Sequence, residues 1–561
     1  MGITSKTYSN RAYWRSFGWI SLGTSLISIL LVFPIVVVIS SISKPFGSIW
    51  VHLLDTVLLT YITNSLSLML GVAAGTFILG VSSAWLVTNC QFPGRKTLTW
   101  VLLLPMAMPA YIIAYTYTGL LDVSGPVQTH LRLVFDWSYG DYFFPQIRSL
   151  GGAICMLSLV LYPYVYLLAR LSFENQAGAI LEASRNLGHG HWRTFIFVSL
   201  PMARPAIFAG ITLAMMETLA DFGTVAYFGV NTLTTGVIRT WHGLGDLTSA
   251  AQLSALMMLF VFSLILLEKE SRRKLRFYKN EFRDKPKRIE LRRSRAAFAC
   301  FYCCFVVMIG FLLPSLQLLI WAAGHWRDNI TTSFLHLASN SFLLASVSAL
   351  SCVIVAVLLS IMNRNSNSKL SNAQVEFAKL GYAVPGAVIA VGALIPAGWI
   401  DNQLNLLTSA WFQKSIGLVV SGSLSLLIFA YIVRFLSVSI HTVESGLSSI
   451  KPNIDESAYC LGASRLRVSK QIHLPLLRSS LVTAFILVFV DVLKELPATL
   501  ILRPFNFNTL AIRTYELASD ERLMDAALPA LTIVIIGLLP IICILRTIEK
   551  QQISNEESAD T

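Results

Sequence analysis

Charge is scarce in this sequence. Only 13% of its 561 residues are charged and 55% are hydrophobic, whereas a soluble domain carries about 25% charged residues. This shortage excludes a disordered chain and an ordinary cytosolic enzyme, because so many apolar side chains need surroundings other than water.

Motifs for catalysis and metal binding are also lacking. No G-x-x-x-x-G-K-[ST] loop occurs, so we expect no ATP hydrolysis by a P-loop in this chain. No Ser/His/Asp or metal-ligand constellation supports an enzyme acting on lipid. Among the eight cysteines, Cys300, Cys303 and Cys304 form a C-x-x-C-C without the second cluster that metal sites need. We interpret these thiols as small buried hydrophobic groups.

What the sequence has in place of charge is long hydrophobic runs. A membrane-spanning helix needs about 20 mostly apolar residues, and twelve runs qualify. We therefore predict an all-α integral membrane protein with twelve transmembrane helices, the first retained and not cleaved as a signal peptide. The runs lie near residues 18–41, 58–87, 98–121, 150–170, 203–229, 249–267, 297–322, 337–362, 376–399, 415–438, 477–502 and 524–545.

Lys and Arg predict the orientation of these spans. With both termini in the cytoplasm, 33 of the 43 basic residues lie on the cytoplasmic side and 9 in outer loops. Thirteen of them fall between Lys269 and Arg295. Two interpretations fit this run, a site for anionic lipid heads and a solvated linker that fixes topology, and we favour the linker. The net charge of +13 then reflects membrane topology, and we expect no nucleic-acid partner.

The chain is an internal duplication. The basic linker 269–295 separates a first half, residues 1–268, from a second half, residues 296–561, with six spans each. A segment of the first half returns in the second at an offset of 274 residues. It runs from Glu182 through Gly188 to Leu200-Pro201, and its counterpart runs from Glu456 through Gly462 to Leu474-Pro475. We predict two parallel six-helix repeats.

The duplicated segment lies in the long cytoplasmic connections 171–202 and 439–476. Its pattern predicts a short helix, a left-handed turn at Gly188 or Gly462, a second short helix, and a new span that begins at Pro201 or Pro475. Small residues after the glutamate let another surface approach closely. These are Ala183 and Ser184 in the first copy, and Ser457 and Ala458 in the second.

This segment resembles the EAA loop of ABC importer permeases, in which E-A-A-x-x-x-G is followed by I-x-L-P. The first copy fits closely, whereas the second has Ser457 for an alanine and Lys470 for the apolar residue before Leu474-Pro475. The resemblance implies the type I importer fold and loops that dock on an ATPase. It also implies two ABC ATPase copies that bind the ATP and Mg, no cofactor on this chain, an extracytoplasmic substrate-binding protein, and the bacterial inner membrane.

Four carboxylates fall inside predicted spans. Glu217 aligns with Asp491 and Asp221 with Glu495, so each half is predicted to carry two acids at i and i+4 on one face of one helix. Because each buried charge costs at least about 2.5–3.5 kcal/mol, we favour a water-filled translocation pathway that holds a cation only transiently. The alternative is structural pairing, for example of Asp491 with Lys494.

The segments 217–229 and 491–500, which begin at Glu217 and Asp491, resemble those of fused ferric-iron ABC permeases. This resemblance implies a ferric-iron-binding partner protein. Hard cations prefer oxygen ligands, so the four acids suit this substrate. Permeases for thiamine, polyamines or phosphonate share the overall plan and remain alternatives. A proton-coupled secondary transporter with six plus six spans is a further alternative. It would need a basic signature in the loops 90–97 and 363–369, which lack it.

Overall fold

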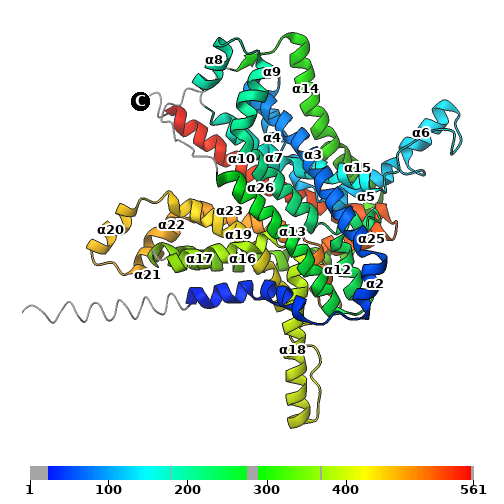
Figure 1. The fold of residues 1–561 in the computed structure, drawn as a ribbon, viewed down its shortest axis with the longest axis vertical. Coiled ribbons are helices and arrows are strands. Elements are labelled where there is room, and N and C mark those ends of the chain that lie inside the picture. The colour runs from blue at the N-terminus through cyan, green and yellow to red at the C-terminus, as the bar shows by residue number, and fades with distance from the viewer. Residues whose placement is uncertain (1–22, 177, 274–287, 367–368, 558–561) are drawn as a thin grey trace, which may run out of the picture. The chain divides into compact units, whose positions relative to one another are not determined.

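The computed structural model describes residues 23–176, 178–273, 288–366 and 369–557, which are helical over most of their length (Figure 1). Within these ranges the strands are β1 (Cys90–Gln91) and β2 (Ile289–Glu290), which pair in parallel. The predicted all-α fold class is confirmed. Parts of two predicted segments, residues 274–287 of the linker and 18–22 of the first span, lie outside the described residues.

The first half contains a series of helices of very different lengths. In chain order these are Gly23–Ser43 with its 3-10 end η1 (Ser41–Ser43), α2 (Ser48–Thr56), α3 (Leu58–Asn89), α4 (Arg95–Val101), η2 (Leu104–Ala107), α5 (Ala110–Leu121), α6 (Pro126–Phe135), α7 (Leu150–Glu174), α8 (Gly178–Asn186), α9 (His191–Thr194), the π-helix η3 (Phe195–Ser199), α10 (Leu200–Ala220), α11 (Gly223–Tyr227), α12 (Leu233–His242) and α13 (Leu247–Arg273).

The second half repeats this order. Its helices are α14 (Arg293–Val307), the π-helix η4 (Met308–Leu312), α15 (Leu313–Asn329), α16 (Thr332–Ser366), α17 (Lys369–Ala378), η5 (Lys379–Ala383), α18 (Gly386–Phe412), α19 (Leu424–Ser448), α20 (Pro452–Cys460), α21 (Arg465–Val468), the π-helix η6 (Ser469–His473), α22 (Leu474–Leu476), α23 (Arg478–Leu493), α24 (Pro497–Leu502), α25 (Leu510–Ser519) and α26 (Leu523–Glu557).

The predicted repeat is reproduced most closely from α7 to η3 and from α19 to η6. Both ends of α19, α20, α21 and η6 lie 274 residues after those of α7, α8, α9 and η3. The starts of α5 and α18 differ by 276 residues, each directly after the aligned prolines Pro109 and Pro385. The duplication seen in the sequence is therefore also a duplication of local structure.

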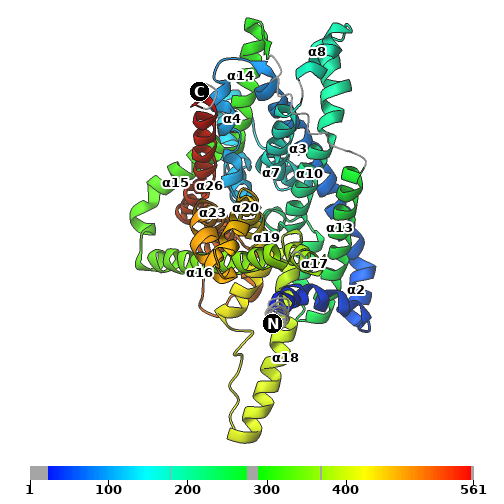
Figure 2. The ribbon, with the colours of Figure 1, turned by 90° about the vertical axis from the view of Figure 1, so that its left-hand side faces the viewer.

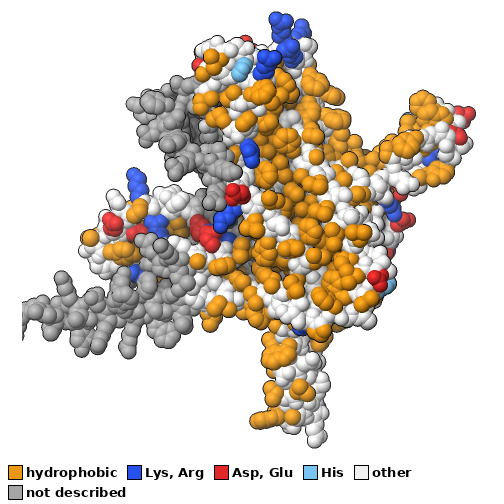
Figure 3. Space-filling view, viewed as in Figure 1, with side chains coloured by type: hydrophobic (Ala, Val, Ile, Leu, Met, Phe, Trp, Pro, Cys, Tyr) orange, Lys and Arg blue, Asp and Glu red, His pale blue; other side chains and the backbone are white. Residues whose placement is uncertain are grey.

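Ten helices of the described residues are long and apolar enough to cross a membrane, and two bent helix pairs raise the number to twelve. This agrees with the predicted twelve spans. Their exposed faces are apolar, as expected for contact with lipid: Leu59, Leu70 and Ile78 on α3 are each more than 60% exposed. Figure 3 shows hydrophobic side chains spread over the face that carries α3 and α7.

The third predicted span, 98–121, is not one continuous helix. It bends by 91° between Arg95–Ala107 and Ala110–Phe135. Met108 precedes Pro109 and is extended (φ −90°, ψ 116°), because a residue before proline is kept out of the helical region. Two tyrosines on α7 satisfy carbonyls that this break exposes. Tyr162 donates to the Leu102 carbonyl at 2.8 Å and Tyr166 to the Thr99 carbonyl at 2.7 Å.

The predicted tenth span, 415–438, is displaced along the chain. Helix α18 continues to Phe412, and the next helix, α19, begins only at Leu424. The intervening loop is folded back along α18 (Figure 1). Buried Asp401 on α18 accepts hydrogen bonds from the backbone N–H groups of Val419, Val420 and Ser421 at 2.7–3.1 Å. These bonds hold an apolar stretch as a loop, although hydropathy assigned it to a helix.

The described residues pack as two compact units, and each unit contains helices from both sequence halves. Unit 1 contains the described residues of Met1–Pro45, Leu244–Ala255 and His336–Thr509. Unit 2 contains Phe46–Gly243, Leu256–Leu335 and the described residues of Leu510–Thr561. The boundaries 1–268 and 296–561 therefore describe the repeat in the sequence, whereas the packing groups the helices differently.

Helices α3, α7 and α10 form the centre of unit 2 and lie side by side in both ribbon views (Figures 1 and 2). Glycines permit this close packing. A Cβ at Gly210 of α10 would lie 2.7 Å from the backbone of Val165, and one at Gly80 of α3 would lie 2.8 Å from the Val165 side chain. Small residues at helix contacts let the two backbones approach closely. The resulting van der Waals contacts stabilise helix packing within a membrane, where no hydrophobic driving force acts between helices.

Candidate functional site

The two duplicated loops, 171–202 and 439–476, which we call the coupling loops, have the same backbone geometry. Gly188 and Gly462 adopt φ of +87° and +81°, so the predicted left-handed turns are confirmed. Each is followed by an N–H that bonds back into the helix, from His189 to Ser184 at 3.2 Å and from Ala463 to Ala458 at 3.0 Å. With the bonds from the glycine N–H groups to Arg185 and Tyr459, this is the Schellman end of a helix.

The prediction that a new span begins at Pro201 is wrong, whereas in the second loop the helix bends at Leu477, two residues after Pro475. The helix of the first loop runs without a break from His191 through η3 and Leu200 to Ala220. A proline inside a helix clashes with the carbonyl four residues before it. In both halves a π-helical turn, η3 or η6, directly precedes Leu-Pro. This wider turn shifts the preceding carbonyl relative to the proline ring and so relieves the clash.

The predicted contact residues of both loops divide into exposed and buried ones. Glu182, Ala183, Glu456 and Ser457 are exposed, and so are Gly188 and Gly462. Ser184 and Ala458 instead face inward. Ser184 Oγ lies 3.2 Å from Thr194 Oγ1, which joins α8 to α9. Ser184, the third residue of the motif that begins at Glu182, therefore packs α8 against α9.

Each loop also presents apolar side chains that the sequence prediction did not name. Three pairs of residues at the offset of 274 are exposed to matching extents: Ile180 and Ile454 at 41% each, Leu187 and Leu461 at 81% and 89%, and Trp192 and Leu466 at 69% and 65%. We call each trio an apolar coupling patch. Solvent-facing apolar groups repeated in this way indicate a protein contact, and the signal was available from aligning the two halves.

The predicted pair Glu217 and Asp221 does not lie on one helix. Helix α10 ends at Ala220, and Asp221 caps the short helix α11 instead. Its carboxylate accepts hydrogen bonds from the Thr224 N–H at 3.1 Å, the Thr224 hydroxyl at 3.0 Å and the Val225 N–H at 3.2 Å. Glu217 lies in the last turn of α10, half-buried, and no described side chain or backbone group donates a hydrogen bond to it.

The second pair is likewise divided by a helix end. Asp491 lies on α23 and Lys494 and Glu495 lie beyond its end, so the prediction of one helical face is wrong here too. Lys494 Nζ lies 2.9 Å from Asp491 Oδ1, the structural pairing that we considered as the alternative. Glu495 is 6% exposed and forms an ion pair with Arg434 at 3.1 Å. It also accepts a bond from the Ala498 N–H.

Arg434 is a charged residue inside a span that could not be recognised from the predicted span boundaries. The predicted span 415–438 placed it at the cytoplasmic end, whereas it lies in the middle of α19 and is buried. Applying the offset of 274 to the fourth span would have located it inside the membrane.

Comparison with known proteins supports the duplicated architecture. The family described as "Binding-protein-dependent transport system inner membrane component" matches twice, over residues 76–269 and 353–551. The Fe(3+)-transport system permease protein FbpB 2 of Haemophilus influenzae is 25% identical over 492 residues, which are 86% of this chain and 88% of that protein.

Two shorter relatives match part of the chain. The molybdenum transport system permease protein ModB of Escherichia coli is 30% identical over 177 residues, 32% of this chain and 72% of ModB. The sulfate transport system permease protein CysT of Escherichia coli is 25% identical over 222 residues, 38% of this chain and 75% of CysT. The chain therefore belongs to the family of binding-protein-dependent transport system inner membrane components, carries the family's domain twice, and has the type I ABC importer permease fold.

Proposed function

We propose that this chain is the transmembrane subunit of an ATP-driven importer that takes ferric iron from an extracytoplasmic binding protein and releases it into the cytoplasm by alternating access. The choice of substrate rests on the share of this chain that each relative matches. The iron-transport relative aligns with 86% of the chain, through both halves, whereas the molybdenum and sulfate relatives align with 32% and 38%.

The apolar coupling patches support the proposed ATPase partner. Because both loops expose the same kind of side chain at the same positions, they suit two copies of one protein better than two different proteins. We infer that each ATPase copy takes one loop and that ATP and Mg bind there, with no nucleotide on this chain. In this arrangement both loops and both termini lie on the cytoplasmic side.

The carboxylates support a cation as cargo, with unequal parts for the two halves. Asp491 and Glu495 each have a basic partner, at 2.9 and 3.1 Å. Glu217 and Asp221 form no such ion pair with any residue that the structure describes. We infer that the first half supplies the more negative lining of the pathway, where Glu217 offers oxygen ligands to a hard cation in transit.

Uptake by whole cells tests this proposal. A bacterial strain that lacks the gene is complemented with the wild-type chain or an empty vector, and uptake of radiolabelled ferric iron, molybdate, sulfate, thiamine and spermidine is compared. We expect the wild-type chain to restore iron uptake only. Restoration of an oxyanion, thiamine or polyamine instead of iron would refute ferric iron as the substrate. Uptake that persists without any ATPase partner would refute the importer mechanism.

A further inference from the structure

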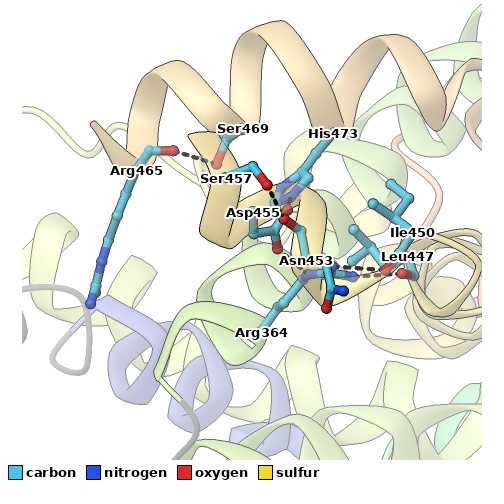
Figure 4. A network of polar contacts seen from close by, with 9 residues as sticks. All are labelled: Arg364, Leu447, Ile450, Asn453, Asp455, Ser457, Arg465, Ser469 and His473. Atoms are coloured by element: carbon cyan, nitrogen blue, oxygen red, sulfur yellow. Dashed lines mark hydrogen bonds and ion pairs between the residues drawn. The ribbon is translucent and has the colours of Figure 1, made fainter. Parts of the chain in front are cut away.

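The second coupling loop is held by a chain of polar contacts between Arg364, Asp455 and His473 (Figure 4). Arg364, near the end of α16, donates from Nε to Asp455 Oδ2 at 2.9 Å. It also donates to the carbonyls of Leu447 at 2.6 Å and Ile450 at 3.0 Å. Because a carboxylate only accepts, His473 Nε2 donates to the other oxygen of Asp455, at 2.9 Å. One carboxylate thus joins an arginine and a histidine.

These contacts connect four elements of unit 1. Leu447 lies in the last turn of α19 and Ile450 two residues beyond its end, where carbonyls lack the usual helical partner four residues later. The Leu447 carbonyl also accepts a hydrogen bond from the Ile450 N–H at 3.1 Å. Asp455 lies on α20, the short helix that also carries Glu456. His473 closes the π-helix η6. Asp455 therefore ties the entry and the exit of the coupling loop to the same arginine.

The contacts are sheltered from water. His473 is fully buried, and the Asp455 and Arg364 side chains are 13% and 20% exposed. Ion pairs in such surroundings contribute little net stability but fix geometry, since each partner is costly to leave unpaired. Arg364 uses three nitrogens on three acceptors, which allows few alternative positions.

The first coupling loop is held differently. Leu181 stands where the second loop has Asp455, and Ser199 stands where it has His473. Leu181 is buried, and Trp85, Phe173 and Phe195 pack together with ring centroids 4.6–6.4 Å apart. Gln176 Nε2 also donates a buried hydrogen bond to the Ser199 carbonyl at 2.8 Å. The first loop is thus held by apolar packing and neutral hydrogen bonds, whereas an ion pair holds the second loop at the corresponding position.

We propose that Arg364, Asp455 and His473 are positioning residues that transmit movement of the second coupling loop to the bend at Leu477, where α23 begins. His473 lies four residues before this bend, and its carbonyl accepts a bond from the Leu477 N–H at 2.9 Å. The two helical pieces meet there at 70°. Helix α23 in turn leads to Asp491. The inference rests on the proposed function, because it requires a loop that the ATPase moves.

The test uses the complete transporter, with its ATPase and binding protein, in proteoliposomes. Two variants break the chain: Asp455→Asn, which removes the charge but keeps the shape, and His473→Ser, which installs the residue of the first loop and leaves the ion pair with Arg364 intact. We expect uptake per ATP hydrolysed to fall about tenfold in Asp455→Asn and less in His473→Ser. ATP hydrolysis itself continues in both.

Glu376→Gln is the matched control. Glu376 is an exposed carboxylate of the same unit, 2.7 Å from Lys379, and Lys379 keeps a second partner in Glu444. We expect this variant to keep the wild-type ratio of uptake to hydrolysis. A merely structural role would instead lower complex yield, thermal stability, uptake and hydrolysis together.

The outcomes separate the two proposals. If wild-type complexes take up iron with ATP but His473→Ser and Asp455→Asn keep the wild-type ratio, or lose both activities in proportion, the positioning role is refuted. If Asp455→Asn fails to assemble, the ratio in His473→Ser decides the question alone. If the wild-type chain neither binds an ATPase nor transports iron, the proposed function itself fails.

Discussion

Arg434 and Glu495 form a buried ion pair in unit 1, with 3.1 Å between Nη1 and Oε1 and side chains that are 9% and 6% exposed. The pair lies against the first residue of α18, Gly386. A Cβ built at Gly386 would collide with both the guanidinium and the carboxylate. The ion pair therefore needs a glycine at this position.

We predict that Gly386→Ala lowers the free energy of unfolding by about 1–3 kcal/mol, because the added methyl would force apart the buried guanidinium and carboxylate. The measurement is the thermal midpoint of the purified protein in detergent. Gly398→Ala on the same helix is the control, since no atom lies within 4 Å of its Cβ position. Equal midpoints for the two variants would contradict the packing argument.

The left-handed glycines of the coupling loops give a second prediction. Gly188→Ala and Gly462→Ala meet no atom within 4 Å, so their cost is backbone strain alone, about 1–2 kcal/mol. We expect faster hydrogen exchange at the His189 and Ala463 amides, which bond across the turns. Gly190→Ala is the control because Gly190 has φ of −66° and equally open surroundings. Faster exchange in the control as well would show that the strain is not specific to positive φ.

The apolar coupling patches predict where the ATPase binds. Leu187→Ser and Leu461→Ser change side chains that are 81% and 89% exposed, so the fold is not disturbed. We expect each substitution to weaken binding of the purified ATPase by about tenfold, the effect of losing about 1.4 kcal/mol of apolar contact. Leu418→Ser, at a residue 62% exposed in the loop between α18 and α19, serves as control. If a variant that carries both substitutions binds the ATPase with unchanged affinity, the patches are not part of the interface.

Cysteine labelling tests the proposed orientation. Cys460 ends α20 and is exposed, whereas burial raises the pKa of Cys90 to about 11. At pH 8 only about one in a thousand Cys90 side chains is then a thiolate. We expect a membrane-impermeant maleimide to label Cys460 in inside-out vesicles and not in right-side-out ones, and the ATPase to protect it. Cys155 and Cys304 are exposed as well, so the labelling of Cys460 is the difference in signal between the wild type and Cys460→Ser. A difference that appears in right-side-out vesicles would contradict the predicted topology.

Local patterns of the sequence were sufficient for much of the fold. The offset of 274 predicted matching helices in the two halves, and Gly188 and Gly462 predicted left-handed turns, because helix ends are encoded within a few residues. The coupling loops could thus be located and their backbone anticipated.

Contacts between distant residues account for what was missed. Hydropathy assigned residues 415–423 to a span, whereas Asp401 holds part of that segment as a loop through hydrogen bonds from about 20 positions away. The same displacement hid Arg434. Helix ends at Ala220 and Leu493 were missed because the carboxylates that follow, Asp221 and Glu495, cap the next helix, an arrangement that an i and i+4 pattern does not reveal.

Glu217 provides the sharpest test of the translocation pathway. It is the one of the four predicted carboxylates to which no described group donates a hydrogen bond. An amide at this position removes a charge without breaking a bond, so we expect Glu217→Gln to keep the wild-type thermal midpoint and the basal ATPase activity of the complex while iron uptake falls about tenfold. Asp221→Asn should behave differently. Loss of the charged cap of α11 costs about 1 kcal/mol, so stability and uptake should fall together.

Uptake of radiolabelled ferric iron in proteoliposomes, measured beside thermal unfolding, separates these effects for Glu217→Gln. Asp525→Asn is the control, because Asp525 is half-buried like Glu217 but is paired with Arg522 at 2.7 Å. We expect this variant to transport at the wild-type rate. The argument for Glu217 depends on its charge attracting a cation that then moves on. If Glu217→Gln transports iron as well as the wild type does, the unpaired carboxylate has no part in the pathway. If it loses stability as Asp221→Asn does, its role is structural.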